Sequence, residues 1–216
     1  MTRAPIAIEE IWRRYDEVES RLTAPLSERM LDLAELRPDM RVLDLATGRG
    51  EPALRAARRV GPRGAVVGVD RSAALLRMAR EKADREGLAN LELRAADAEA
   101  QGEWPPRHFH AVTCRWGLMY MTAPVTVLAH ARRALLPSGA LVGGRMRPRS
   151  GRSSWCAAWQ STLPSPATAV LTELAISYGA NDLVARWKLP RPSPSTRPPP
   201  TTPRCCSISS SCTSTI

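Results

Sequence analysis

The sequence contains no long apolar run. No stretch reaches the roughly 18 consecutive apolar residues that a membrane-spanning helix needs. The first residues, MTRAPIAIEEIWRRY, also lack the apolar core of a secretory signal peptide. We therefore expect a cytoplasmic protein without a membrane span.

Lysine is almost absent, although the chain is basic. Of 31 Lys and Arg residues, only Lys82 and Lys188 are lysines, and the net charge is +10. The arginines are scattered, and the few aromatic residues, 5% of the chain, do not interleave with them. A nucleic-acid groove needs basic residues gathered on one face together with planar side chains that stack on bases. We therefore expect no nucleic-acid partner.

Cysteine and histidine are also sparse. The five cysteines form no C-x-x-C pair, and the three histidines lie far from most of them along the chain. Zinc sites usually show closely spaced pairs of Cys or His, and disulfide frameworks show a high density of cysteines in a short secreted chain. We expect neither a metal site nor a disulfide framework.

What the sequence does contain is a regular alternation of strand-like and helix-like segments. Strands are predicted at 41–46, 65–70, 91–97, 110–116 and 140–144, and helices at 51–60, 72–87 and 124–136. Helices of this length between strands imply parallel βαβ crossovers. The predicted fold class is α/β, a Rossmann-like doubly wound and mainly parallel sheet with two leading N-terminal helices, at 7–22 and 26–36.

The stretch RVLDLATGRGEPAL, residues 41–54, raises the question of a cofactor. It matches the pattern G-x-G-x-x-A, and Asp70 follows Gly50 by 20 residues at the end of the next predicted strand. This spacing is typical of a dinucleotide-binding loop. The alternative is that the glycines only form a tight turn between a strand and a helix.

The charges around this loop distinguish between ligands. Asp44 and Glu51 would place carboxylates beside the pyrophosphate of a dinucleotide, which is repulsive in a partly desolvated cleft. S-adenosylmethionine has no phosphate and carries an ammonium and a sulfonium cation instead. The sequence therefore favours S-adenosylmethionine as the cofactor.

Five segments in order carry a family resemblance: VLDLATGRGEPAL, VVGVDRSAALLRMAR, LRAADAEA, FHAVTCRWGLMYM and ARRALLPSGALV. They resemble the motifs of class I S-adenosylmethionine-dependent methyltransferases. The similarity is greatest to the small-molecule branch (methyltransferase type 11 domain) that includes the ubiquinone/menaquinone-biosynthesis C-methyltransferases. It covers about residues 35–145 and fades beyond 147. Ala46 stands where the family has glycine, and His110 where it usually has aspartate.

The resemblance implies a set of cofactor-binding residues. A carboxylate suits a ribose because it can accept hydrogen bonds from both hydroxyls, and this role falls to Asp70. The alternative for Asp97 is a simple cap at the end of a strand. The residues on the methionine side would be Asp44, Ala46, Gly48 and Gly50, Asp97 and Ala98 would face the adenine, and Cys114 and Arg115 would lie beneath the reactive methyl group. Thr47 and Arg71 are further cofactor-binding candidates.

The segment after the fourth predicted strand, RWGLMYM, is rich in Met and aromatic residues. In the family, an N-terminal helix often closes over the cofactor. An apolar substrate pocket is therefore predicted, and packing within a core is the alternative. Its residues would be Trp12, Tyr15, Trp116, Met119 and Tyr120.

The sequence suggests no catalytic base. His108 and His110 come at the start of the fourth predicted strand, and ligands of parallel sheets bind at the opposite, carboxyl end. A base would be needed only where the acceptor must lose a proton.

Three parts of the chain are predicted: a helical cap at 1–36, the S-adenosylmethionine-binding domain at 37–147, and an Arg-, Pro- and Ser-rich tail at 148–216. Within the tail, 168–179 fits a helix and 182–188 a strand, and the last 28 residues have a disorder-prone composition. Because periodicity is lost abruptly after the fifth strand, out-of-frame translation of the end of the gene is a further hypothesis, which resequencing would test.

The predicted function is transfer of a methyl group from S-adenosylmethionine to a small-molecule acceptor. A non-catalytic or defective cofactor-binding remnant and an RNA or protein methyltransferase are the alternatives. The acceptor, the choice among C-, O- and N-methylation, and the oligomeric state do not follow from the sequence.

Overall fold

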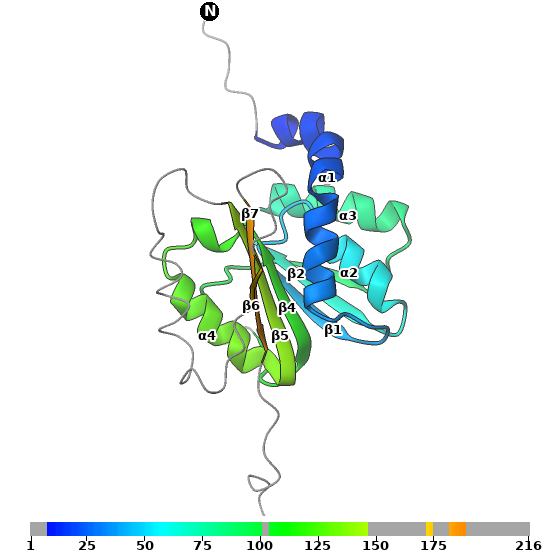
Figure 1. Ribbon diagram of the computed structural model, residues 1–216. Helices are drawn as coiled ribbons and strands as arrows, with labels where there is room; N and C mark the ends of the chain where they lie inside the picture. The colour runs from blue at the N-terminus through cyan, green and yellow to red at the C-terminus, as the bar shows by residue number, and fades with distance from the viewer. Residues whose placement is uncertain (1–7, 101–103, 147–171, 175–181, 189–216) are drawn as a thin grey trace, which may run out of the picture.

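The computed structural model describes residues 8–100, 104–146, 172–174 and 182–188. Their elements alternate along the chain as strand and helix (Figure 1). The helices are α1 (Ile8–Leu33), α2 (Ala53–Val60), α3 (Ala73–Arg85), the 3-10 turn η1 (Leu118–Tyr120) and α4 (Pro124–Ala134). The strands are β1 (Arg41–Leu45), β2 (Ala65–Asp70), β3 (Leu91–Ala95), β4 (Phe109–Arg115), β5 (Leu135–Met146), β6 (Thr172–Leu174) and β7 (Asp182–Lys188).

All described strands belong to one sheet, in the order β3-β2-β1-β4-β5-β7-β6. β1 pairs in parallel with β2 on one side and β4 on the other, so the strand order reverses at the centre of the sheet. β2 and β3 are also parallel, as are β4 and β5. β7 is antiparallel to both of its neighbours, β5 and β6. The predicted doubly wound, mainly parallel sheet is confirmed.

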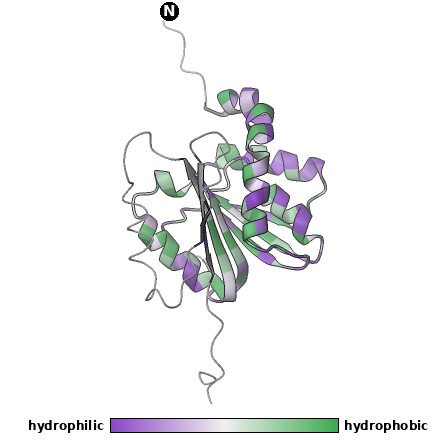
Figure 2. Ribbon diagram, viewed as in Figure 1, coloured by the Kyte–Doolittle hydropathy of each residue, from purple (hydrophilic) through white to green (hydrophobic). Residues whose placement is uncertain are grey.

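The sheet is covered on both faces because successive side chains of a buried strand point in opposite directions. Val42 packs in one core cluster, with the buried residues of α1 and α2. Leu43, the next residue, packs in the other cluster, with the buried residues of α4. Figure 1 shows α1, α2 and α3 on one side of the sheet and α4 on the other, and Figure 2 shows hydrophobic residues along the strands between them.

The prediction of two leading helices was wrong, because α1 is one continuous helix with Pro25 inside it. Proline has no N–H, so the backbone carbonyl four residues before Pro25 has no helical partner. Pro25 is exposed, so this carbonyl can bind water instead. The following turns bury Leu26, Met30 and Leu31 completely or nearly so, at 2%, 0% and 0% exposure. This burial extends the helix through the proline.

The region after β5 also differs from prediction in part. A helix was expected at 168–179, but Thr172–Leu174 form β6, because they pair with β7 from Thr172↔Arg186 to Leu174↔Val184. The strand predicted at 182–188 is confirmed as β7. β5 begins at Leu135 instead of at residue 140. The remainder of 168–179 and the predicted disorder of the last 28 residues lie outside the described residues.

Within the described part of the chain, no helix combines the length and apolar character needed to cross a bilayer.

Candidate functional site

The loop between β1 and α2 is held in a conformation that depends on its small residues. Ala46, Gly48 and Gly50 all have positive φ angles, of 54°, 53° and 96°, and glycine adopts such angles without steric cost. At Gly50 a Cβ would lie only 2.8 Å from Leu54 Cδ1 and 3.2 Å from Ala79 Cβ. Gly50 therefore lets the loop pack closely against α2 and α3.

Asp70, at the end of β2, anchors this loop. Its Oδ2 accepts a hydrogen bond from the Gly48 amide at 2.8 Å, and its Oδ1 accepts one from the Ser72 amide at 2.8 Å. An ionised carboxylate has about four acceptor positions. Asp70 therefore fixes the loop and retains the capacity to accept hydrogen bonds from a ligand.

A cleft of about 340 Å³ opens where the loops after β1, β2, β3 and β4 meet the first half of α1. This is the carboxyl end of the parallel strands, at the reversal of strand order, where ligands bind in such sheets. The cleft brings together eleven of the residues predicted for the site: Trp12, Ala46, Thr47, Gly48, Asp70, Arg71, Asp97, Ala98, Arg115, Trp116 and Tyr120.

Five other predicted residues do not line the cleft. Asp44 and Cys114 are buried beneath it, and Gly50 packs against α2 and α3. Tyr15 lies on the outer face of α1, where it is 54% exposed. Met119 is half-buried in η1 and is not among the residues that line the cleft. The roles of Tyr15 and Met119 in a substrate pocket stay predictions, and the lining of this cleft does not include them.

The cleft also includes residues that the motifs did not suggest, among them Glu19, Arg49, Glu51, Glu99 and Met121. Glu19 follows Trp12 by seven residues, which is two helical turns and therefore the same helix face. Arg49 stands between the two glycines of the loop. Helix periodicity could have found Glu19, but the inward direction of this face depends on how α1 packs.

An ion-pair cluster joins α1 to the glycine loop. The Arg49 guanidinium donates to the carboxylates of Asp16 and Glu19, and its Cζ lies 4.4 Å from the centre of the Trp12 ring. From α3, Lys82 donates to Asp16 at 2.7 Å and to the Arg49 carbonyl at 3.2 Å. One wall of the cleft is thus held by charged contacts.

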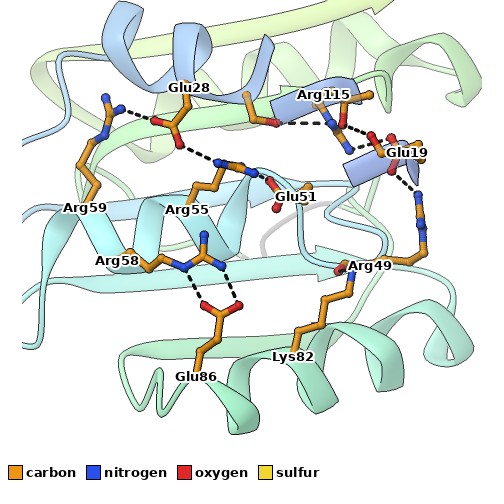
Figure 3. Close-up of polar contacts among 12 residues, drawn as sticks. Glu19, Glu28, Arg49, Glu51, Arg55, Arg58, Arg59, Lys82, Glu86 and Arg115 are labelled. Atoms are coloured by element: carbon orange, nitrogen blue, oxygen red, sulfur yellow. Dashed lines mark hydrogen bonds and ion pairs between the residues drawn. The ribbon is translucent and has the colours of Figure 1, made fainter. Parts of the chain in front are cut away.

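Arg115, at the end of β4, extends the cluster beneath α1. Its guanidinium donates to Glu19 at 3.2 Å and to Ser27 at 3.4 Å. Figure 3 shows Glu19 between Arg49 and Arg115. The Arg115 side chain is 7% exposed, and burial lowers its pKa because desolvation disfavours the charged form.

Below the glycine loop, Asp44 is fully buried and accepts a 2.6 Å hydrogen bond from the Thr113 hydroxyl. Burial raises the pKa of Asp44 to about 7, although the Thr113 hydrogen bond opposes the shift. Burial also raises the pKa of Glu51, against the effect of its partner Arg55, which donates to it at 2.8 Å. A second carboxylate, Glu28, joins Arg55 to Arg59 on the outer side of this network (Figure 3).

The charge of the cleft distinguishes between cofactors. Among its described lining residues, carboxylates outnumber guanidiniums by five to three: Glu19, Glu51, Asp70, Asp97 and Glu99 against Arg49, Arg71 and Arg115. Arg49 and Arg115 are already paired with α1, so they offer little free positive charge for a pyrophosphate. The lining residues fit a cofactor with cationic groups better than a dinucleotide.

Metal binding and catalysis by His110 are two other chemistries to consider, and the described residues support neither. They contain no group of three or more His, Cys, Asp or Glu side chains arranged to hold a metal ion. His110, which the sequence placed at the start of β4, accepts a 3.0 Å hydrogen bond from the Arg41 amide at the amino end of the sheet. It therefore lies at the opposite end of the strands from the cleft.

Comparison with known proteins gives a consistent result. A family model described as "Methyltransferase domain" matches residues 36–178. Aklanonic acid methyltransferase DauC of Streptomyces sp. (strain C5) is 34% identical over 115 residues, which cover 53% of this chain and 52% of that protein. Ubiquinone/menaquinone biosynthesis C-methyltransferase UbiE of Bordetella avium (strain 197N) is 36% identical over 133 residues, 60% of this chain and 51% of that protein. The chain therefore spans about half the length of these curated relatives.

Among solved structures, a SAM dependent methyltransferase from Aquifex aeolicus has the same fold, with a TM-score of 0.62 at 20% identity over 76% of this chain and 89% of that one. The predicted family resemblance is confirmed by the family model, which matches more than half of the chain. The chain belongs to the methyltransferase-domain family.

Proposed function

We propose that the protein binds S-adenosylmethionine in the cleft and transfers its methyl group to a small-molecule acceptor. The observation that carries the proposal is the position of Asp70. Its carboxylate holds the glycine loop through Gly48 and faces an acid-rich cleft, with acceptor positions left for a vicinal diol. Family membership supports the same cofactor.

The lining residues divide among the parts of the cofactor along the ends of the strands. Asp70 would hold the ribose, and Asp97 with the Ala98 amide would hold the adenine, because these residues follow β2 and β3. The loop from Ala46 to Gly48 would hold the methionine part, where its backbone permits close approach. Nearby carboxylates, including Glu51, would favour the ammonium group.

The acceptor would lie against the wall formed by Trp12, Trp116, Tyr120 and Met121. When bound, S-adenosylmethionine supplies an electrophilic methyl group on a sulfonium. The residues of the chain contribute by orienting the acceptor in line with that methyl group and by excluding water. Loss of the sulfonium charge during transfer means that apolar walls do not oppose the reaction. The curated relatives include a C-methyltransferase by name. The product of the transfer assay below identifies the atom that this protein methylates.

Calorimetry with S-adenosylmethionine, its demethylated product S-adenosylhomocysteine, and NADH tests the cofactor. We expect both sulfur ligands to bind and NADH not to bind. Asp70→Ala should weaken binding of both sulfur ligands at least tenfold, whereas Asp84→Ala, at an exposed position on α3, should leave it unchanged. Binding of NADH, or equal affinities for the two variants, would contradict the assignment.

Transfer itself is tested with methyl-labelled S-adenosylmethionine and a panel of phenols, enols and carboxylic acids. Label in at least one acceptor, lost in Asp70→Ala, supports the enzyme. Cofactor binding without label in any acceptor would favour the non-catalytic remnant instead.

A further inference from the structure

Glu51 combines two properties that conflict with each other: its carboxyl group lines the cleft, and the protein encloses it almost completely. It follows the glycine loop directly, just before α2, and its side chain is only 9% exposed. Water therefore stabilises its charge poorly, and burial raises its pKa. A carboxylate in such a position stays charged only if cations of the chain replace the lost solvation.

Charged groups on three elements act on Glu51: Arg55 and Arg58 of α2, Arg115 of β4, and Asp44 of β1. The three arginines favour the charged form of Glu51, and the Asp44 carboxylate opposes it. Among the described contacts, only Arg55 forms a hydrogen bond with Glu51, from Nε to Oε2 at 2.8 Å. Arg55 is therefore the cation best placed to keep this carboxylate charged.

The other two arginines are bound to other carboxylates. Arg115 donates to Glu19 at 3.2 Å, and Arg58 donates from Nε and from Nη2 to Glu86, at 2.6 Å in both cases. These pairs direct the two guanidiniums away from Glu51. Neither arginine can replace Arg55 without leaving its present partner.

The position of Arg55 is fixed from its opposite side by α1. Its Nη1 donates to Glu28 Oε1 at 2.9 Å, and Glu28 is also bound by Arg59. Figure 3 shows the Arg55 guanidinium between Glu28 and Glu51. A planar guanidinium that is held by two carboxylates has little freedom to rotate. The bond to Glu51 is therefore held in one direction.

This arrangement leaves one oxygen of Glu51 for a ligand. Arg55 uses Oε2, and no described residue donates a hydrogen bond to Oε1. Arg55 is absent from the cleft lining, whereas Glu51 is part of it. Arg55 can therefore influence a bound ligand only through Glu51.

We propose that Arg55 is a positioning residue for cofactor binding, which holds the Glu51 carboxylate charged and in place for the ammonium group of S-adenosylmethionine. The inference rests on the proposed function. The alternative is an ordinary ion pair between residues four apart, which only stabilises the start of α2. Such a pair would not distinguish ligands with an ammonium group from ligands without one.

Calorimetry at pH 6.5 with S-adenosylmethionine and 5′-methylthioadenosine makes this distinction, because the second ligand lacks the amino-acid part. Arg55→Met should weaken binding of S-adenosylmethionine about fivefold, since a charged interaction at a partly exposed site is worth about 1 kcal/mol. Binding of 5′-methylthioadenosine should not change, which also shows that the cleft of the variant is folded.

Arg59→Met is the matched control. Arg59 lies on the same helix, is similarly exposed and also binds Glu28, but it does not contact Glu51. This variant should bind S-adenosylmethionine with wild-type affinity. Arg55→Lys keeps the charge and should recover part of the affinity that Arg55→Met loses.

The pH dependence provides a second readout. Arg55 lowers the pKa of Glu51, so Arg55→Met should raise this pKa and let Glu51 take up a proton at higher pH. The affinity of Arg55→Met for S-adenosylmethionine, relative to that of the wild type, should therefore decrease as pH falls from 7 to 5.5. The α-ammonium group of the ligand stays charged over this range, because α-amino groups have a pKa of about 8.

A double-mutant cycle tests whether Arg55 acts through Glu51. In a Glu51→Gln background, Arg55→Met should not weaken binding further. Three results would overturn the inference: equal losses for the two ligands, equal losses for Arg55→Met and Arg59→Met, or a full effect of Arg55→Met in the Glu51→Gln background. A wild type that does not bind S-adenosylmethionine would overturn the proposed function as well, so the two failures are distinguishable.

Discussion

Residues 8–22 and residues 23–33 belong to one continuous helix, yet they contact the rest of the molecule through different chemistry. The second half buries Leu26, Met30 and Leu31 against the sheet. In the first half, four apolar side chains form an exposed outer stripe, Ile11, Tyr15, Val18 and Leu22. This half contacts the glycine loop and α3 through ion pairs to Arg49 and Lys82. The second half is thus fixed by core packing, and the first half by ion pairs that border the cleft.

The difference teaches how one helix can be part of both the core and the site. Apolar burial is nearly independent of direction and stabilises the whole fold. Ion pairs at the edge of a cleft are individually weak and screened by salt. The first half can therefore open locally at low cost while the second half keeps the fold intact.

The largest expected change in the free energy of unfolding comes from a substitution in residues 23–33, the half of α1 that is packed into the core. Leu31→Ala should lower the free energy of unfolding by about 3 kcal/mol, because it empties a fully buried site in the core. Leu22→Ala, on the outer stripe, should change it by less than about 0.5 kcal/mol. Urea unfolding at dilute protein concentration measures both values. Similar losses for the two variants would show that the first half is also packed into the core.

The next effect concerns the pH dependence of stability that arises from Asp44, which is buried in β1 beneath the glycine loop. Its pKa is raised to about 7 from 3.8, so between these values the folded state binds a proton that the unfolded state has released. The free energy of unfolding should therefore fall as pH rises from about 4 to 7 and lose this dependence above 7, with a slope of at most about 1.4 kcal/mol per pH unit.

Asp44→Asn removes this titration and keeps an oxygen for the Thr113 hydroxyl. The stability of Asp44→Asn relative to the wild type should therefore increase between pH 5 and 6 and stay constant from pH 8 to 9. Denaturation at several pH values measures the difference. A difference that does not vary with pH would mean that Asp44 titrates alike in both states.

The smallest expected effect is on the local stability of residues 8–22, the half of α1 that is held by ion pairs. Glu19→Gln weakens the contacts to Arg49 and Arg115 and should cost about 1 kcal/mol of local stability. Amide hydrogen exchange over residues 10–22 should accelerate about fivefold, since 1.4 kcal/mol corresponds to tenfold, and that over residues 26–33 should not change.

Glu17→Gln serves as the control for Glu19→Gln. Glu17 pairs only with Arg21 among the described contacts, and its side chain is 85% exposed, so exchange should stay at the wild-type rate. Raising the salt concentration should reproduce part of the Glu19→Gln effect. Uniform acceleration over the whole of α1 would show that the helix opens as one unit.

Most of the sheet and the glycine loop could be predicted from the sequence, because local patterns encode them. The apolar runs and turns around Gly48 and Asp70 placed β1, α2 and β2 to within a few residues. β6 could not be predicted, since Thr172–Leu174 are strand only through pairing with β7. The sequence predicted two helices separated between residues 22 and 26, but α1 continues through Pro25, because the following turns bury Leu26 and Met30.

The site was predictable in position but not in its complete lining. Motif spacing located Asp70, Asp97 and Arg115 because each follows a strand whose end meets the same edge of the sheet. The same spacing could not tell that Asp44 and Cys114 lie beneath the cleft. Whether a side chain lines a cavity or supports it depends on what packs above it.

By itself, the sequence determined the alternation of strands and helices, the glycine loop and its acidic partner Asp70, because these depend on periodicity and local backbone preference. Only the tertiary structure decided which face of α1 turns to the cleft. An amphipathic pattern shows two faces but not their directions. The buried cation Arg115 and the loop cation Arg49 draw the acidic face inward, and the apolar stripe is left outside.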